Sequence, residues 1–457
     1  MKKVSIGGCS AFWGDLLDPV VLMAETADVQ YLAFDHLAEL TMSLLHRMKE
    51  KNPERGFIPD IIPWHKALLP ITTKRGIKMV SNGGGANPIA GAKAVVNVAK
   101  ELGLTGFKVA AVTGDDLTDR LDELRAKGIK LTNLDTGEED IDSIKDKIVS
   151  AYAYVGSESI IDALKEGADT VIAGRVSDNA CYVGPWMYEF GWEFDKDIDK
   201  IDAAITCGHI IECSSCVTGG AMCSLWKDVP EPWNVGYPIM TMDENGEAIL
   251  SKTPNTGGLV NTWTAREHLA YEIHDPSNYL MPDGVPDFTR VKLEDIGKDM
   301  VKVSNMGGKS RPDTLKVGIG YQAGWKQEIQ QWFCWPDALE KAKRAEYILR
   351  EWLKRERVKP VDMEFNYMGF NMQHKFMKVP ESAPDLPEVG IRCCVKYNTR
   401  EDAMRFRRNA FLWTGFPAGW CFNTTTAPAM PAPIIALWPT LVPRGEIKTE
   451  MTMMEVK

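Results

Sequence analysis

The sequence predicts an α/β fold with a doubly wound, mostly parallel sheet, followed by a small α+β domain. Short apolar segments recur along the first part of the chain with helical patterns between them, which is typical of parallel strands joined by helices. Near residue 225 the pattern changes to turns and short extended stretches. The chain has 457 residues, more than one hydrophobic core usually serves, so two domains are expected.

Five apolar or β-branched segments are the expected strands of the parallel sheet. They are "KVSIGG" (residues 3–8), "YLAFD" (31–35), "IKMVSN" (77–82), "KVAAVTG" (108–114) and "TVIAG" (170–174). Two of the helices between them have clear ends. Residues 87–104 place Pro88 in the first turn and stop at Gly103, and residues 115–128 begin with two aspartates and end at Gly128.

The expected domains are a core of residues 1–357 and a smaller domain of residues 358–457. Within the core, residues 225–330 contain turn sequences such as "DENGEA" and predict an antiparallel insertion or a lid. A charged helix is expected over residues 337–357. The strands and single helix that follow predict a small α+β unit with an extended tail rich in Pro and Thr.

Composition excludes several classes of partner. The net charge of −10 argues against binding to nucleic acid or to an anionic membrane surface, because both need clustered Lys and Arg. No window approaches the roughly 20 apolar residues that cross a bilayer. The chain has ten cysteines and no export signal, so reduced thiols in a cytoplasmic protein are expected.

Polar residues follow each expected strand, where an open parallel sheet binds its ligands. The Gly-rich turn "SNGGGANP" (residues 81–88) lacks a nucleotide-binding spacing, so no nucleotide cofactor is expected, but its backbone amides could hold an anion. The expected substrate-binding residues are Ser81, Asn82, Gly84, Asn87, Asp115 and Lys316. The alternative is that such residues only cap helices and form turns.

The stretch "CGHIIECSSCVTGGAMC" (residues 207–223) is a candidate metal site. His209 and Glu212 would share one side of a helical turn, and Asp178 is the expected third ligand of a divalent ion. The alternative is a hydrogen-bonded core histidine and a glutamate paired with Arg175. Most of the cysteines are expected to be buried packing residues, because a single C-x-x-C lacks the second pair of a usual zinc site.

His274 is a candidate general acid or base. It stands in the turn sequence "YEIHDP" (residues 271–276), and an imidazole titrates near neutrality. A loop histidine beside Asp and Pro could equally cap a turn. Both interpretations stay open on the sequence alone.

Several motifs, in order along the chain, resemble the acyclic terpene utilization protein AtuA family. They include "IGGCSAFWGD", "MVSNGGGANPIAGAKAV", "AGRVSDNA", "GHIIECSSCVTGG" and "RPDTLKVGIGY". The resemblance extends from residue 3 to about 357. It implies a small ferredoxin-like domain after the core, and a catabolic role on a small carbonyl compound or acyl thioester. Cys216, where an amide residue is expected, and "GWKQEIQQWF" depart from the family pattern.

Two functions are compatible with these features. The first is a divalent-metal-dependent hydrolase or lyase that cleaves a small β-dicarbonyl compound, including a cyclic one, by adding water to a carbonyl. Its expected catalytic residues are Glu212, His274, Arg175 and Asp35. Mn²⁺ is the expected metal ion, with Zn²⁺ and Mg²⁺ as alternatives, and a homo-oligomer is expected. The second function is an acyl-CoA-binding partner of an acyl-CoA carboxylase system.

Overall fold

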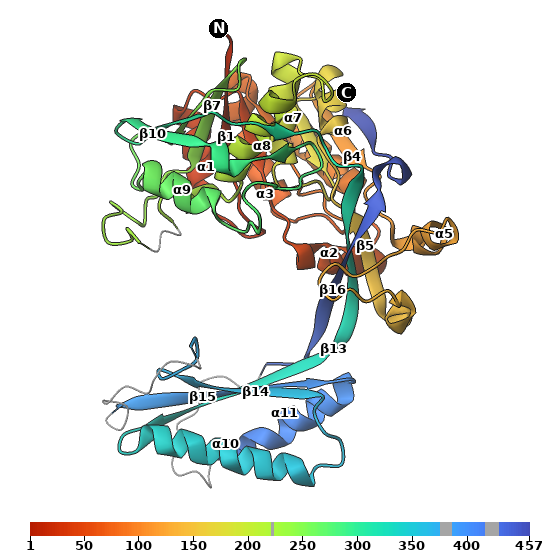
Figure 1. The fold of residues 1–457 in the computed structure, drawn as a ribbon, viewed down its shortest axis with the longest axis vertical. Coiled ribbons are helices and arrows are strands. Elements are labelled where there is room, and N and C mark those ends of the chain that lie inside the picture. The colour runs from red at the N-terminus through yellow and green to blue at the C-terminus, as the bar shows by residue number, and fades with distance from the viewer. Residues whose placement is uncertain (221–223, 375–385, 416–428) are drawn as a thin grey trace. The chain divides into compact units, whose positions relative to one another are not determined.

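The protein forms two compact units in a computed structural model (Figure 1). The structure describes residues 1–220, 224–374, 386–415 and 429–457. The first unit comprises Met1–Gly320 with Leu437–Lys457, and the second comprises Tyr321–Ala436.

The division between the units differs from the expected boundary after residue 357. Helix α10 (Ala338–Arg355) belongs to the second unit because it packs on strand β15 (Glu388–Tyr397) and buries Leu349 and Leu353 there. At the other end, the last strand of the chain returns to the first unit. A sequence pattern locates such elements but does not say which core their apolar faces join.

Five adjacent strands of the first unit are parallel, as the sequence predicts. In spatial order they are β1 (Lys3–Gly8), β2 (Tyr31–Phe34), β3 (Lys78–Ser81), β6 (Thr170–Ala173) and β4 (Lys108–Thr113). Nearly all of their residues are buried, which explains their near-continuous apolar sequences. Because the strands are parallel, their carboxyl ends lie at one edge of the sheet.

Antiparallel strands extend the same sheet on both sides. Beyond β1 follow β7 (Pro238–Asp243), β8 (Ala248–Lys252), β11 (Met300–Ser304) and β10 (Lys292–Gly297), and beyond β4 lies β17 (Glu450–Glu455). Within the described residues, four parallel and five antiparallel pairings therefore join ten strands. The sheet is mixed rather than mostly parallel, because the insertion adds strands to it instead of forming a separate lid.

Helices pack on this sheet in two groups. One group contains α1 (Asp18–Thr26), α3 (Ile61–Arg75) and α4 (Pro88–Glu101), and the other contains α6 (Glu158–Lys165), α7 (Ala180–Phe190) and α8 (Ile198–Glu212). The connection from β3 to β4 and the one from β4 to β6 run in opposite directions, so right-handed crossovers put α4 and α6 on opposite faces. A mixed α/β fold is confirmed, and a doubly wound core stays a prediction.

The first unit has further helices and strands outside these two groups and the main sheet. They are α2 (Glu39–Lys51), α5 (Leu121–Ala126), α9 (Thr262–Leu269), β5 (Ile148–Ala153), β9 (Val285–Pro286) and β12 (Gly308–Lys309). Strands β9 and β12 pair with each other and contact α8.

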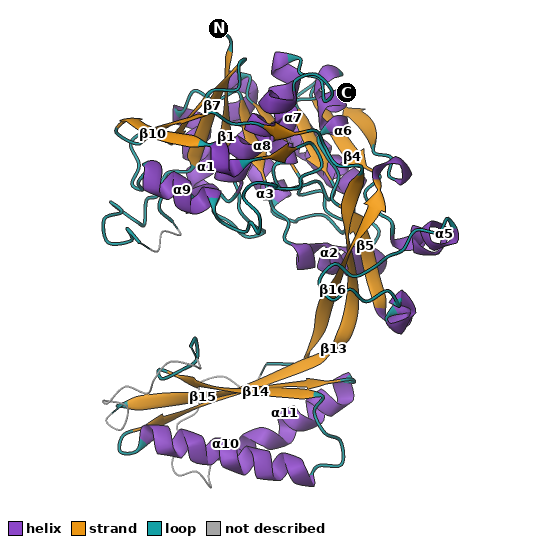
Figure 2. Ribbon diagram, in the orientation of Figure 1, coloured by secondary structure: helices purple, strands orange, loops and turns teal. Residues whose placement is uncertain are grey.

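The second unit is a sheet with helices on one face. The strand order is β14 (Asp362–Met368), β15, β13 (Thr314–Cys334) and β16 (Ala432–Pro443). The last two strands are shared between the units, because β13 up to Gly320 and β16 from Leu437 onward belong to the first unit. Figure 2 shows α10 and α11 (Arg400–Gly415) on the same face of this sheet, and both contact β15. Alternate residues of β15, such as Ile391 and Val395, are buried against them. A ferredoxin-like topology stays a prediction.

Candidate functional site

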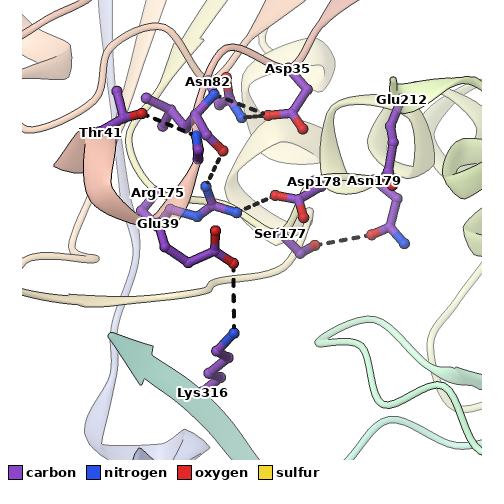
Figure 3. A network of polar contacts seen from close by, with 12 residues as sticks. Asp35, Glu39, Thr41, Asn82, Arg175, Ser177, Asp178, Asn179, Glu212 and Lys316 are labelled. Atoms are coloured by element: carbon purple, nitrogen blue, oxygen red, sulfur yellow. Dashed lines mark hydrogen bonds and ion pairs between the residues drawn. The ribbon is translucent and has the colours of Figure 1, made fainter. Parts of the chain in front are cut away.

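Side chains from the ends of the parallel strands meet at one edge of the sheet, and Figure 3 shows Asp35, Asn82 and Arg175 among them. Asn82, which follows β3, donates from Nδ2 to the carboxylate of Asp35, which follows β2. The Oδ1 atom of Asn82 accepts from the backbone N–H of His36 at 2.7 Å. His36 Nδ1 lies 2.9 Å from the hydroxyl of Ser10, which follows β1. All four side chains are buried, so one hydrogen-bond network joins these strand ends.

Arg175, which follows β6, supplies the positive charge at this edge. It is 1% exposed, donates to the carboxylate of Asp178, and donates to the carbonyl oxygen of Leu37 at 2.6 Å. Its guanidinium carbon lies 4.1 Å from the centre of the Tyr154 ring, a cation–π contact. Within the described residues, its Nε atom has no hydrogen-bond partner.

Carboxyl groups outnumber cations here. Burial raises the pKa of Asp35. The negative charges of Asp178 and Glu212 raise this pKa further, and the positive charge of Arg175 lowers it. Burial also raises the pKa of Glu212, and the charge of Asp178 adds to the effect. These shifts show that the three carboxyl groups lie close enough to repel one another around a single guanidinium.

The Gly-rich turn of residues 81–88 satisfies several of its own backbone N–H groups. The Ser81 hydroxyl accepts from the N–H of Gly83 at 2.9 Å, and the N–H of Asn87 donates to the carbonyl of Gly84 at 2.9 Å. Those amides are therefore not available to an anion. The structure favours a structural role for Ser81 over the expected substrate contact.

Asn87 and Gly84 also have structural roles in this turn. The Asn87 side chain caps α4 by accepting from the N–H of Ala90, and its Nδ2 donates to the carbonyls of Pro53 and Arg55. A Cβ on Gly84 would stand 2.6 Å from the carbonyl oxygen of Ala173, so only glycine lets β3 and β6 approach here.

Asp115 and Lys316 are the other two expected substrate-binding residues, and both lie near Arg175. The Asp115 carboxylate accepts from the backbone N–H of Arg175 at 2.7 Å and ties β4 to β6. Burial raises its pKa to about 7. The Lys316 ammonium lies 4.8 Å from the Tyr154 ring and 3.9 Å from the Glu39 carboxylate, and its side chain is 45% exposed.

The stretch that contains His209 forms the end of α8. This helix is buried on all sides from Ile201 onward, which fits its apolar sequence. A Cβ on Gly8 would stand 2.2 Å from the carbonyl oxygen of Ile211, so the end of β1 touches the last turn of α8. This approach brings Glu212 to the same edge of the sheet as Asp35. His209 Nδ1 lies 3.1 Å from Glu212 Oε1, at the expected three-residue spacing.

A group that could hold a metal ion lies at this helix end. Glu212, Cys213 and His268 each offer one ligand atom, and these atoms all lie within 4.8 Å of one another. Glu212 Oε2 and His268 Nε2 are buried and, among the described residues, lack a hydrogen-bond partner. Burial lowers the pKa of His268 to about 3, so its imidazole is neutral and able to bind a metal.

The grouping differs from the expected ligands His209, Glu212 and Asp178. Asp178 is paired with Arg175, and His209 bonds to Glu212 and stacks on the rings of His268 and Phe288, with centroid distances of 5.7 and 5.3 Å. Burial lowers the pKa of His209 to about 4, so its imidazole is neutral near neutral pH and its contact with Glu212 is a hydrogen bond rather than an ion pair. His209 and Asp178 as ligands stay a prediction.

His268 was not expected from the sequence. It stands in the last turn of α9, whose start is capped by Asn261 and Thr264, and it reaches His209 across the fold. The sequence draws attention to His274, only six residues later, because of its neighbouring Asp and Pro. In the structure His274 is exposed, and within the described residues no hydrogen bond or ion pair joins it to the cluster.

The cysteines of this stretch divide into two kinds. Cys207 is fully buried in α8, which agrees with a packing role, whereas Cys213 and Cys216 are partly exposed. Cys223 lies outside the described residues. All eight cysteines within the described part of the chain are free thiols.

A pocket of about 400 Å³ is lined by residues 230–231, 256–261, 295 and 297–299, none of which is an expected site residue. No helix in the described part of the chain is long and apolar enough to cross a membrane.

Comparison with known proteins identifies the family of the chain. Neither a curated protein nor a solved structure matches it. Residues 4–453, nearly the whole chain, match the acyclic terpene utilisation family protein AtuA. The match agrees with the resemblance of the motifs and extends it from residue 357 to residue 453. The chain therefore belongs to the AtuA family of acyclic terpene utilisation proteins.

Proposed function

We propose that this protein is a catabolic enzyme, a metal-assisted hydrolase or lyase that cleaves a small β-dicarbonyl compound by adding water to a carbonyl. The proposed substrates include cyclic β-dicarbonyl compounds, whose ring the reaction would open. The family description supports a catabolic role in terpene utilisation. The observation that carries the proposal is the group formed by Glu212, Cys213 and His268, beside a buried edge rich in carboxyl groups.

Two unpartnered atoms support a bound metal ion. Glu212 Oε2 and His268 Nε2 are both buried without a partner among the described residues. A buried polar atom without a partner costs about 1–3 kcal/mol, so such atoms are rare unless a ligand completes them. A metal ion between the two residues would satisfy both.

The balance of charge supports the same conclusion. Asp35, Asp178 and Glu212 lie near one guanidinium, that of Arg175, and burial makes a negative charge on Asp35 or Glu212 costly. A divalent cation would remove this excess and lower the pKa of Glu212.

The donor types favour zinc over the expected Mn²⁺. A thiolate and an imidazole are ligands that Zn²⁺ prefers, whereas Mn²⁺ and Mg²⁺ favour oxygen. Three protein ligands would leave a position for water or substrate, as in catalytic zinc sites. His209 would orient Glu212 through the hydrogen bond at 3.1 Å.

The other residues then have separable roles. A zinc ion would supply Lewis acidity toward a carbonyl oxygen. Arg175 would hold negative charge that develops on the substrate, because its Nε is unpartnered among the described residues. Asp35, with a pKa raised by burial, would carry the proton between water and the leaving carbon.

Elemental analysis of protein purified without chelator tests the proposal. We expect about one zinc per chain in the wild type, and less than about a tenth of that in Glu212→Gln and His268→Asn. His274→Asn is the matched control and should keep its zinc. Full zinc content in both ligand variants contradicts the site.

Metal content, together with CoA binding, distinguishes the enzyme from the second candidate function. An acyl-CoA-binding partner of a carboxylase would hold the CoA phosphates on strand-end glycines, but the turn of residues 81–88 already uses amides internally. Protein without metal that retains CoA on a column would favour that alternative.

We further propose a cytoplasmic homo-oligomer with a doubly wound core and a ferredoxin-like second unit. The free thiols of the described cysteines support a reducing compartment. Light scattering on the purified chain measures the oligomeric state.

A further inference from the structure

The two cysteines that follow α8 are joined by a tight turn. Cys213 caps the helix, residues Ser214–Cys216 form one turn of 3₁₀-helix, and the N–H of Cys216 donates to the carbonyl of Cys213 at 3.1 Å. Such a turn keeps its first and last Cα atoms within about 7 Å, and a disulfide needs roughly 4.4–6.8 Å. The two thiols also influence each other, because Cys216 raises the pKa of Cys213 and Cys213 lowers the pKa of Cys216.

The pair is also accessible to small molecules. Cys213 and Cys216 are partly exposed, whereas Cys9, Cys181 and Cys207 are buried. A soluble disulfide can therefore reach this pair and not those three. The three buried thiols are inert to exchange for the same reason.

We propose that Cys213 and Cys216 form a reversible disulfide, and that this bond releases the metal ion held by Glu212, Cys213 and His268. The inference rests on the proposed metal site, because Cys213 is one of its ligands. A sulfur atom in a disulfide no longer offers a thiolate, so oxidation removes one donor of three. Loss of reducing conditions thus switches the site off.

The chemistry needs only a low-molecular-weight disulfide such as oxidised glutathione. Cys216 is free in the metal-bound state, so its thiolate attacks one glutathione sulfur and expels one glutathione thiol. Cys213 then attacks the Cys216 sulfur of the mixed disulfide and expels the second. The cysteine pair loses two electrons to glutathione, one proton is taken up in place of the metal bond, and the divalent ion leaves.

Zinc release and disulfide mapping on the full chain test the inference. Zinc-loaded wild type is treated with oxidised glutathione, released zinc is read with a chromogenic chelator, and the disulfide is located by peptide mass spectrometry. We expect release of about one equivalent, a bond between Cys213 and Cys216, and rebinding of zinc after reduction.

Two variants complete the design. Cys216→Ser keeps all three ligands, so it should bind zinc yet release it at least about tenfold more slowly under oxidised glutathione. Cys394→Ser, a partly exposed cysteine of the second unit, should release zinc like the wild type.

The failures are distinguishable. No zinc in the reduced wild type refutes the proposed site and with it the switch. Zinc that stays bound under oxidised glutathione, is lost equally from Cys216→Ser, or leaves with a disulfide mapped to another pair refutes the switch alone.

Discussion

The Gly-rich turn of residues 81–88 and the helix end at residues 207–216 are both polar segments at the edge of the same sheet, yet they differ in how their polar groups are satisfied. In the turn, the hydroxyl of Ser81 and the side chain of Asn87 bond to backbone groups nearby. At the helix end, Glu212 Oε2 and His209 Nε2 are buried and unpartnered among the described residues.

This difference separates a structural motif from a candidate site. A segment that satisfies its own hydrogen bonds stabilises the fold and offers little to a ligand. A segment that leaves buried donors or acceptors unsatisfied carries a free-energy cost of about 1–3 kcal/mol for each, which a ligand can offset. Sequence composition alone does not distinguish the two segments as candidate ligand-binding sites.

The largest expected effect comes from comparing one substitution in each of the two regions. Cys213→Ala removes a ligand and should weaken zinc binding more than about 100-fold, beyond the range for residues that only support a ligand. Asn82→Ala should instead cost about 1–3 kcal/mol of unfolding free energy, because it leaves the Asp35 carboxylate and the His36 N–H without their partner. Isothermal titration with zinc and urea unfolding measure the two quantities.

The distinction between the two regions is wrong if the variant of the Gly-rich turn affects zinc binding as the variant of the helix end does. Zinc affinity that falls as much in Asn82→Ala as in Cys213→Ala would show that the strand ends bind the metal themselves.

An intermediate effect concerns the pH dependence of stability. The pKa of Asp115 is about 7 in the folded protein, above its ordinary value of about 3.9, so the folded state binds the proton more tightly. Its contribution is fully present at low pH and is lost as pH rises toward 7. Between about pH 4 and 7, wild-type stability should fall by about 1.4 kcal/mol per pH unit relative to Asp115→Asn.

Urea unfolding of both proteins at about pH 5 and about pH 7 measures this slope. A difference between them that is the same at both pH values would show that Asp115 is ionised in the folded protein throughout.

The smallest expected effect concerns the cap of α4. Asn87→Ala should lower the unfolding free energy by about 1 kcal/mol, because the N–H of Ala90 loses its acceptor. Zinc content and any activity on a β-dicarbonyl substrate should be unchanged. Loss of activity at unchanged stability would instead support the expected role of Asn87 in substrate binding.

Much of the sheet can be predicted from the sequence. The five parallel strands are confirmed because each is buried on both faces and is therefore a short, nearly continuous apolar run. The mixed character of the sheet was not predicted, because a pattern of alternating residues in 238–252 does not state which strand it pairs with. Pairing partners are set by contacts between residues far apart in the chain.

The candidate site shows the same limit. Glu212 was selected because it shares a helical turn with His209, and this spacing is confirmed at 3.1 Å. His268 was missed because its approach depends on how α9 packs against α8. His274 was selected from a local pattern and is exposed in the structure.

The sequence by itself determined the local elements, the family, and the pair of residues at the end of α8, because periodicity, turn residues and motif order are local properties. Only the tertiary structure decided that β7, β8, β10 and β11 join the main sheet, that Asp178 pairs with Arg175, and that His268 meets Glu212. The physical reason is that burial removes water, so each buried polar group must find its partner among whichever side chains packing brings near.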